Sequence, residues 1–367
     1  MYKRQYLYKK NPEGANEVIN KLEAKYKQHI EELYSTEEYK QKTLEFVKSV
    51  FDYIRSYTKD IFTLFEEKVI LAQGEIISTN MVTNYLCEQG VKATLIPALE
   101  FMRTDKNSEP DLTYIREKLA IQLEANPDYE IYITQGFICR NAYGEIDNLQ
   151  RGGSDYTASL IGAAVNASEI QIWTDIDGMH DNDPRIVDKT SPVRQLHFEE
   201  AAELAYFGAK ILHPTCVQPA KYANIPVRLL NTMEPTAPGT LISNETEKGK
   251  IKAVAAKDNI TAIKIKSSRM LLAHGFLRKV FEIFESYQTA IDMVCTSEVG
   301  VSMSIDNTKH LNEIVDDLKK YGTVTVDHDM CIVCVVGDLE WENVGFEAKA
   351  LCLLYTSPSP RDPKTSR

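Results

Sequence analysis

Apolar runs that alternate with helical patterns through the middle of the chain restrict the fold more than any other feature. Each run is apolar at nearly every position, so its strand needs cover on both faces, and the intervening helices supply that cover in a mostly parallel sheet. The sequence therefore predicts an α/β fold, in which ligands bind at the carboxyl ends of the strands. The predicted strands are 92–98, 130–140 and 169–175, and the predicted helices are 74–90 (opening on Gly74 and Glu75), 110–126 and 154–167.

Length, charge and cysteine content narrow the class of protein. The chain has 367 residues and 43% hydrophobic residues, enough for two domains and part of a third, and its net charge of −11 argues against nucleic-acid or membrane-surface partners. No apolar run approaches a membrane span, and no signal peptide opens the chain. Seven cysteines without an even framework favour a cytoplasmic location. Two helical patterns in the first 66 residues, 16–34 and 44–54, carry no chemistry of their own.

After Asn244 the pattern changes to strand, helix, two strands, helix and strand, which is the ferredoxin-like order. The run at 330–339 then predicts a further strand, and 343–351 a further helix, as if a second copy began there. Cys331 and Cys334 form a C-x-x-C. Residues three apart in a strand face opposite sides, which favours a buried strand over a metal or redox pair.

The stretch "QRGGSD" at 150–155 combines an arginine with the glycines of a strand-to-helix turn. Glycines let backbone N–H groups approach an anion, and Arg151 can bind a carboxylate or phosphate with two hydrogen bonds. Ser154 and Asp155 suit the start of the next helix. A capped helix after a tight turn would explain every residue here except the arginine.

Other polar residues follow the predicted strands. The acids of 173–185 loosely match a calcium loop, a magnesium–nucleotide site or a solvated acidic loop. Lys210 could contact phosphate oxygens of a ligand or the terminal carbonyl groups of a helix. Glu75 could pair with the ammonium group of a substrate or interact with the dipole of its own helix. Together these residues predict phosphoryl transfer, which depends on positioning and charge neutralisation.

Several motifs in order resemble aspartate kinase: "ITQGFI", "RGGSDYTA", "IWTDIDG", "NDPR", "FGAKILHP", "NIPVRLLNT" and "PGTLI". "RMLLAHGFL" and "IDMVCTSEVGVSMSID" resemble the regulatory region of the monofunctional, lysine-sensitive branch. The resemblance implies an amino-acid-kinase three-layer α/β/α sandwich with a mostly parallel sheet, followed by ferredoxin-like (βαββαβ) ACT domains. It also implies ATP and Mg²⁺ as cofactors, phosphorylation of the side-chain carboxylate of L-aspartate to 4-phospho-L-aspartate, and feedback inhibition by L-lysine in the lysine, threonine and methionine pathway.

The resemblance also assigns residue roles, and it implies a homodimer through the ACT domains. Arg151 would hold the α-carboxylate and Glu75 the α-ammonium, while Ser154 and Asp155 would line the reacting carboxylate; Asp155 and Lys210 would be catalytic. The nucleotide would be bordered by Thr174, Asp175, His180, Arg185, Lys210 and Ile211. The effector pocket, at a dimer interface, would be formed by Met270, Gly275, Phe276, Leu277, Asp292, Ser297 and Glu298.

The chain departs from the family at both ends and at single positions. Residues 1–5 and 352–367 resemble translated sequencing-adapter sequence, and the family's Lys-Phe-Gly-Gly loop is missing. We therefore expect an inactive fragment that lacks both natural termini. Within the chain, "DNLQ" at 147–150 stands where the family usually has Thr-Thr-Leu-Gly. His180 stands where a tyrosine is common, and Ala273 stands where the lysine pocket has a serine. The expected parts are a catalytic domain at 6–244, a first ACT domain at 245–328 and a truncated second ACT domain at 329–351.

Three alternatives stay open. The first is another amino acid kinase, acting on glutamate, acetylglutamate or UMP. The second is a catalytically dead amino-acid-binding ACT protein. The third is the kinase half of a bifunctional aspartokinase–homoserine dehydrogenase.

Overall fold

The computed structural model describes residues 11–58, 62–150, 152–184, 186–207, 214–245, 249–267 and 274–338, with 212, 247, 270, 345 and 352. It contains two compact units, which are described separately here. The first comprises the described residues of 1–179, 194–198 and 211–246, and the second those of 180–193, 199–210 and 247–367. None of the described helices is both long and apolar enough to cross a membrane.

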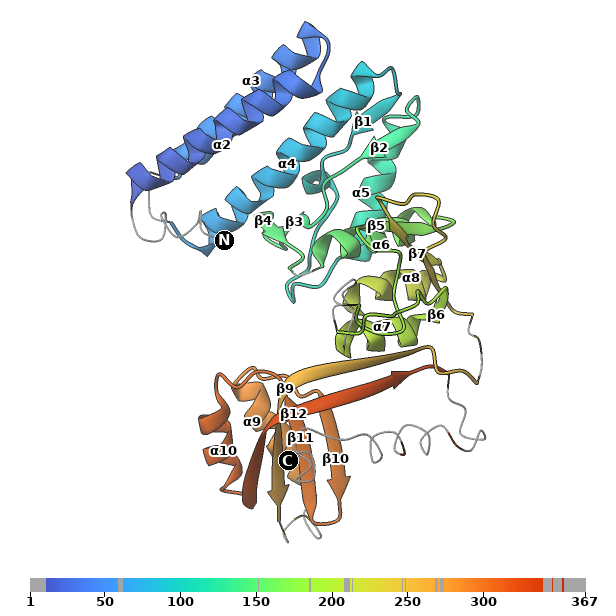
Figure 1. Cartoon of the computed structure of the whole chain (residues 1–367). Coiled ribbons are helices and arrows are strands. Elements are labelled where there is room, and N and C mark those ends of the chain that lie inside the picture. Colours follow the sequence, from blue (N-terminus) through green and yellow to red (C-terminus); the bar gives the residue numbers. More distant parts are fainter. Residues whose placement is uncertain are drawn as a thin grey trace. The chain divides into compact units, whose positions relative to one another are not determined.

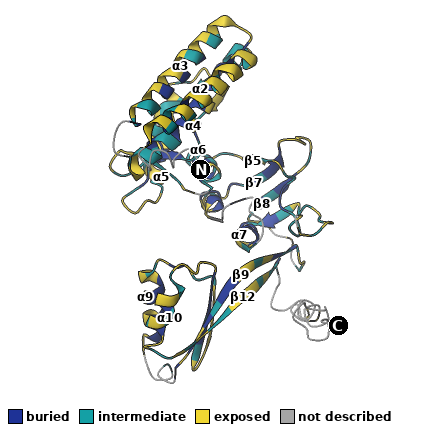
Figure 2. Cartoon of the chain, turned by 60° about the vertical axis from the view of Figure 1, so that its left-hand side comes forward, coloured by how far each residue is buried: buried dark blue, intermediate teal, exposed yellow. Residues whose placement is uncertain are grey.

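The first unit opens with three long helices, α2 (Pro12–Leu33), α3 (Glu37–Ser56) and α4 (Leu64–Glu88). Their apolar stripes meet in a core that includes Ile30, Val47, Phe51 and Met81, while the outer faces of α2 and α3 are exposed (Figure 2). This arrangement confirms the two helical patterns predicted at the start of the chain.

The α/β part of the first unit confirms the predicted fold class. Strands β1 (Ala93–Leu95) and β2 (Ile131–Ile133) pair in parallel. A four-stranded sheet has the order β5-β7-β8-β6, in which β5 pairs with β7 and β6 with β8 in parallel, while β7 and β8 are antiparallel. Its strands are β5 (Ile170–Thr174), β6 (Gln195–His197), β7 (Val227–Asn231) and β8 (Thr240–Ser243).

Helices and short turns connect these strands (Figure 1). They are η1 (Ala98–Glu100), α5 (Leu112–Glu124), α6 (Gly153–Val165), η2 (Pro214–Val217) and α8 (Gln218–Ala223). Helix α7 (Phe198–Phe207) leads from the first unit into the second. A core of buried residues, Phe101, Ile115, Ile138 and Leu160 among them, joins α5 and α6 to the strands.

The prediction of one continuous strand at 130–140 is wrong. The chain leaves β2 after Ile133 and re-forms as β3 (Ile138–Arg140), which makes an antiparallel hairpin with β4 (Ile146–Asn148). The break lies at Gln135, Gly136 and Phe137, where Phe137 has a positive φ of 71°, outside the range of regular extended backbone.

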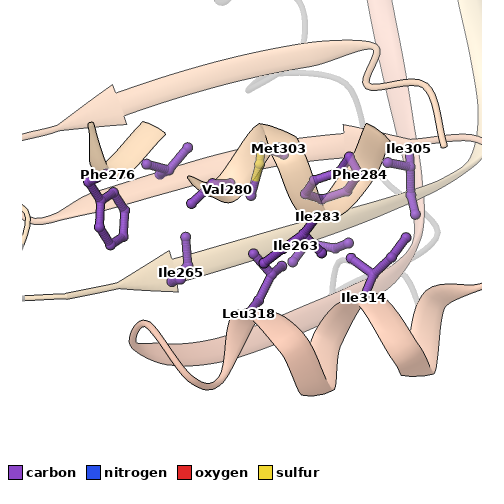
Figure 3. Packing of buried hydrophobic residues seen from close by; sticks show 11 residues of the cluster. Ile263, Ile265, Phe276, Val280, Ile283, Phe284, Met303, Ile305, Ile314 and Leu318 are labelled. Carbon is purple, nitrogen blue, oxygen red and sulfur yellow. The ribbon is translucent and has the colours of Figure 1, made fainter. Parts of the chain in front are cut away.

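The second unit has the predicted ferredoxin-like order, with β9 (Ala253–Lys266), α9 (Phe276–Ser286), β10 (Met293–Ser297), β11 (Gly300–Ile305), α10 (Leu311–Leu318) and β12 (Thr323–Val336). The sheet order is β10-β11-β9-β12, and all pairs are antiparallel. Figure 3 shows how side chains of α9 and α10 pack onto alternate residues of β9 and β11, such as Ile263, Ile265 and Met303. The opposite face of this part of the sheet carries Lys264, Lys266 and Ser302, the polar residues expected on a face that α9 and α10 do not cover.

The run at 330–339 was expected to start a new strand of a second copy. Instead, Ile332–Val336 continue β12 and pair with Ala253–Lys257 of β9. The register shifts between Asp327 and Ile332, where Asp329 has a φ of 54°, so a bulge bends one strand without ending it. The expected domain boundary at 328 therefore lies inside β12, and the helix expected at 343–351 lies outside the described residues except for Gly345.

The second unit also contains segments 180–193 and 199–207, which the sequence placed in the catalytic domain. Helix α7 is held there by a buried ion pair between Glu200 and Lys252, whose Oε2 and Nζ are 2.7 Å apart. Tyr206 donates a hydrogen bond to Asp292, and the Lys257 ammonium lies 4.3 Å from the centre of the Tyr206 ring. Such contacts between residues far apart in the chain are not readable from periodicity.

Candidate active site

Glu75 lies in the middle of a helix, not at its start. Helix α4 begins ten residues earlier than predicted, because a capping box formed by Thr63 and Glu66 starts the helix at Leu64. Gly74 is helical and has open space around it, so it does not break the helix. The interpretation of Glu75 as a first-turn carboxylate that meets the helix dipole is therefore wrong.

The Glu75 carboxylate is half-buried, and burial raises its pKa above that of an ordinary glutamate. Among the described residues it has no hydrogen-bond or ion-pair partner. A half-buried carboxylate without a partner is a natural acceptor for a cationic group of a ligand.

The turn between β2 and β3 lies against the first turn of α6. A Cβ atom at Gly136 would lie 3.0 Å from the Ser154 hydroxyl, and one at Gly153 would lie 2.8 Å from the Phe137 ring. The Phe137 N–H donates to the Thr157 hydroxyl over 3.1 Å. These contacts explain why glycine is needed at both positions: the two backbones approach too closely for a side chain.

Helix α6 starts after Gly152, which has a left-handed φ of 72°. No side chain caps this end. The Gly153 N–H donates to the Gln150 carbonyl, so the Ser154 and Asp155 N–H groups and the positive dipole end are available to an anion. Ser154 is exposed and Asp155 half-buried in this turn, and neither supplies the cap that the sequence predicted for the segment. Arg151 lies outside the described residues.

Burial raises the pKa of Asp155 as well. Like Glu75, Asp155 has no hydrogen-bond or ion-pair partner within the described part of the chain. Two half-buried carboxylates without partners in the described part of the chain thus lie on elements that the turn at 135–137 joins: Glu75 on α4, and Asp155 in the first turn of α6. Sequence reasoning missed Gln135 and Phe137 of this turn, although a polar residue directly after an apolar strand was a signal for them.

Hydrogen bonds within the first unit hold the loop after β5. The Ile176 N–H donates to the Thr174 hydroxyl at 3.2 Å, and the Met179 N–H donates to the Thr240 hydroxyl at 2.9 Å. Arg194 bridges the Asp177 carboxylate and the Gly239 carbonyl at 3.0 and 3.1 Å. Asp175 is exposed at the end of β5, 3.3 Å from the Thr174 hydroxyl, so its carboxylate can meet a ligand.

The other predicted nucleotide residues are placed less fully. The His180 ring lies in the second unit, where Nδ1 is 2.8 Å from the Thr190 hydroxyl. Arg185, Lys210 and Ile211 lie outside the described residues. Cys331 and Cys334 both lie in β12, as predicted, but the prediction of a buried strand is wrong here, because Cys331 is exposed and Cys334 half-buried. Burial raises the pKa of Cys334 to about 12, and its Sγ is 3.4 Å from a Glu203 oxygen. The described residues hold no cluster of three side chains suited to a metal ion.

The predicted effector residues lie at two ends of the second unit. Met270 and Phe276 pack onto its core, and Gly275 begins α9 with a left-handed φ of 83°. Leu277 is partly exposed, while Ser297 and Glu298 lie at the turn between β10 and β11. Asp292 precedes β10, so about 17 Å of strand separates it from Ser297.

Comparison with known proteins identifies the family. The amino acid kinase family model matches residues 14–231, more than half of the chain. The aspartokinase of Chlamydia trachomatis is 32% identical over 306 residues, which cover 80% of this chain and 69% of that protein. The chain belongs to the aspartokinases of the amino acid kinase family.

Other aspartokinases agree with this assignment. Aspartokinase 1, chloroplastic, of Arabidopsis thaliana is 37% identical over 311 residues, covering 80% of this chain and 54% of that protein. The chain thus spans about half the length of the Arabidopsis relatives that it matches.

Two solved structures of Escherichia coli aspartokinase III are similar to this aspartokinase chain. The R-state complex with aspartate and ADP superposes with a TM-score of 0.79 and 29% identity, over 96% of this chain and 82% of that one. The T-state complex with lysine and aspartate superposes with a TM-score of 0.70 and 32% identity, over 88% and 75% of the two chains.

Proposed function

We propose that the protein containing this chain transfers the γ-phosphoryl group of ATP to the side-chain carboxylate of L-aspartate. The observation that carries the proposal is a pair of half-buried carboxylates without partners among the described residues: Asp155 in the uncapped first turn of α6, and Glu75 on α4, the helix that the turn at 135–137 joins to α6. The E. coli aspartokinase III complex with aspartate and ADP supports the same pair of ligands.

Each substrate group has a proposed partner. Glu75 accepts the α-ammonium, Arg151 holds the α-carboxylate, and Ser154 with Asp155 lines the reacting carboxylate. Thr174, Asp175, His180 and Arg185 border the nucleotide, and Lys210 with Ile211 completes that side. An ionised carboxylate attacks the γ-phosphorus and ADP leaves, so no proton has to be removed and the protein's task is to position two anions.

The substrate carboxylate and the phosphates of ATP repel each other, so cations and N–H donors are needed to neutralise their charge. The first turn of α6 and the side chains of Arg151 and Lys210 would supply them. Mg²⁺ carried on ATP would neutralise phosphate charge, and the exposed Asp175 carboxylate is an oxygen ligand of the type that magnesium accepts.

The direct test is aspartate-dependent release of ADP from Mg-ATP, measured for this chain and for the full-length gene product, each with and without lysine. We expect aspartate-dependent release from the full-length protein, reduced by lysine. Turnover with glutamate or UMP but not with aspartate would show that the protein has another activity of the amino acid kinase family. Aspartate or lysine binding without any turnover would favour a regulatory binding protein.

The pH dependence of aspartate binding should report on Glu75. Only the ionised carboxylate holds an ammonium group, and burial raises the pKa of Glu75, so the KM for aspartate should rise as pH falls through that raised pKa. Glu75→Gln should raise the KM by about 10- to 100-fold at neutral pH, the effect of losing a charge-assisted hydrogen bond, and should remove this acidic limb.

Glu88→Gln is the matched control on the same helix. Hydrogen bonds from Thr36 and Ser35 lower the pKa of Glu88, and it lies away from the turn at 135–137. The control should keep the acidic limb. An unchanged limb in Glu75→Gln would contradict the assignment of Glu75 to the ammonium.

We also propose that two copies pair through β10 and bind a cationic effector there. Strand β10 is an edge of the sheet, and all five of its residues are exposed. Antiparallel pairing about a two-fold axis at Cys295 would bring Asp292 opposite Glu298 of the partner subunit. The Asp292 carboxylate is 1% exposed and pairs with Lys257, so the exposed carboxylate of Glu298 would meet the ammonium of lysine. The lysine complex of E. coli aspartokinase III supports lysine as that effector.

Cys295→Glu should therefore convert the dimer to a monomer, because like charges would meet at the two-fold axis. Light scattering coupled to gel filtration measures this change. The control is Val333→Glu, an exposed position on β12 at the opposite edge of the same sheet, which should leave the mass unchanged. A dimer that survives Cys295→Glu would exclude pairing through β10.

A further inference from the structure

Gln135 is a buried polar residue to which neither the sequence motifs nor the proposed mechanism assigns a role. The residue is only 2% exposed, and both ends of its side-chain amide are used. Oε1 accepts a hydrogen bond from the Ala98 N–H at 2.7 Å, and Nε2 donates to the Thr79 hydroxyl at 2.8 Å. Among uncharged side chains of this length, only an amide has both an acceptor and a donor to fill these two bonds.

On one side, Gln135 is connected to Glu75. Thr79 lies one helical turn after Glu75 on α4, and its hydroxyl donates to the Glu75 carbonyl oxygen at 2.8 Å. The amide of Gln135 is thus two hydrogen bonds away from the backbone of the residue proposed to hold the substrate ammonium. Any shift of Gln135 moves this part of α4 or breaks a buried bond.

On the other side, the residues that follow Gln135 touch the first turn of α6. Gly136 lies so close to Ser154 that a Cβ atom would be 3.0 Å from its hydroxyl. The Phe137 N–H donates to the Thr157 hydroxyl, which in turn donates to the Gly153 carbonyl at 2.8 Å. The turn at 135–137 therefore joins the element that carries Glu75 to the element that carries Ser154 and Asp155.

We propose that Gln135 is a positioning residue that sets the spacing between Glu75 and the first turn of α6, and thereby the length of the amino acid that is phosphorylated. The inference rests on the proposed function, in which the ammonium binds at Glu75 and the reacting carboxylate at Ser154 and Asp155. Aspartate and glutamate differ by one methylene group between these two ends. A spacing held by buried hydrogen bonds rejects the longer substrate, and a looser spacing admits it.

The experiment measures kcat/KM for aspartate and for glutamate in the full-length protein and its variants. Discrimination over one methylene is about 10- to 200-fold in a well-formed site. Thr79→Val and Gln135→Met should each lower the aspartate-to-glutamate ratio by about tenfold, mainly by raising the KM for aspartate, with the KM for ATP unchanged. Thr79→Ser keeps the hydroxyl and should restore the ratio.

Thr43→Val is the matched control, because it removes a hydroxyl that accepts a buried amide hydrogen bond from the same helix, α4. The Asn84 Nδ2 donates to the Thr43 Oγ1 at 3.0 Å, in the contact between α3 and α4. Thr43→Val should lower the melting temperature while keeping the substrate ratio. Equal losses for both substrates in Thr79→Val, or the same change of ratio in Thr43→Val, would overturn the proposal.

The same experiment separates this proposal from the function on which it rests. A wild-type protein that releases no ADP with aspartate rejects the proposed function, and this inference with it. A wild-type protein that prefers aspartate, beside a Thr79→Val variant with an unchanged preference, rejects the inference alone.

Discussion

Replacing Asp155 with asparagine is expected to lower kcat by about 100-fold or more while it raises the stability of the folded protein at neutral pH. The loss of activity follows from the place of Asp155, in the first turn of α6 beside Ser154, where the reacting carboxylate is proposed to lie. Removing one preorganised polar group at the reacting atoms costs about that factor in other enzymes.

The gain in stability follows from the sign of the pKa shift. Burial raises the pKa of Asp155, so its ionised form is less favourable in the folded state than in the unfolded chain. This penalty is present above the raised pKa and disappears as pH falls through it. The neutral amide of the Asp155→Asn variant would not carry the penalty, so we expect the variant to melt higher at pH 7 and to match the wild type in acid.

Asp111→Asn is the control at the neighbouring helix. Asp111 caps α5 by accepting the Tyr114 N–H at 3.1 Å, and its hydrogen bond from Arg103 holds its pKa below the usual range. Its stabilising effect is therefore present above the unfolded pKa, and Asp111→Asn should lower stability at neutral pH by less than about 1 kcal/mol, since the pair is partly exposed. A change of stability at neutral pH in the same direction in Asp155→Asn and Asp111→Asn would contradict this explanation.

Lys257→Met is expected to destabilise the second unit by about 3–5 kcal/mol. The Lys257 ammonium lies 3.1 Å from Asp292 and 2.9 Å from Asp306, and the Asp292 side chain is only 1% exposed. Although burial lowers the pKa of Lys257, its bonds to Asp306 and Asp292 outweigh that effect and raise it. Without the ammonium, the buried Asp292 carboxylate would depend on the hydrogen bond from Tyr206.

The matched control is Lys264→Met on the same strand. Lys264 pairs with Asp327 at 2.8 Å, but both side chains are 46% exposed, so water screens the pair and its loss should change stability by less than about 1 kcal/mol. Unfolding by urea, followed by circular dichroism, compares the two variants. Similar midpoints would show that Asp292 does not depend on Lys257.

Periodicity predicted the second unit better than the first. Its helices are amphipathic and its elements are separated by turns, so their order is recognisable from local windows and the ferredoxin-like order is confirmed, although the continuation of β12 beyond Asp329 was not predicted. The errors fall where local patterns were ambiguous. Gly74 was taken as a helix start although α4 runs through it, and an apolar run at 130–140 hid the break at Gly136 and Phe137.

For the candidate site, the sequence identified the residue types but not their connections. Glu75, Ser154, Asp155 and Asp175 were named in advance, and the structure places the first three on the two elements that meet at the turn at 135–137. The Gln135 amide was missed, because its position after an apolar strand is a signal that does not say which residues the amide binds. Its partners, Thr79 and Ala98, are more than thirty residues away in the chain.

The sequence by itself determined the α/β class, the ferredoxin-like order of the second unit and, through its ordered motifs, the aspartokinase family. Apolar spacing and glycine placement are local properties, so they can be read from a short stretch of sequence without knowing which segments pack against it. Only the tertiary structure decided which of the described carboxylates lack partners, that β12 continues through Cys331, and that Gln135 joins α4 to the turn beside α6. Burial and hydrogen-bond partners depend on segments brought together by folding, and no local pattern records them.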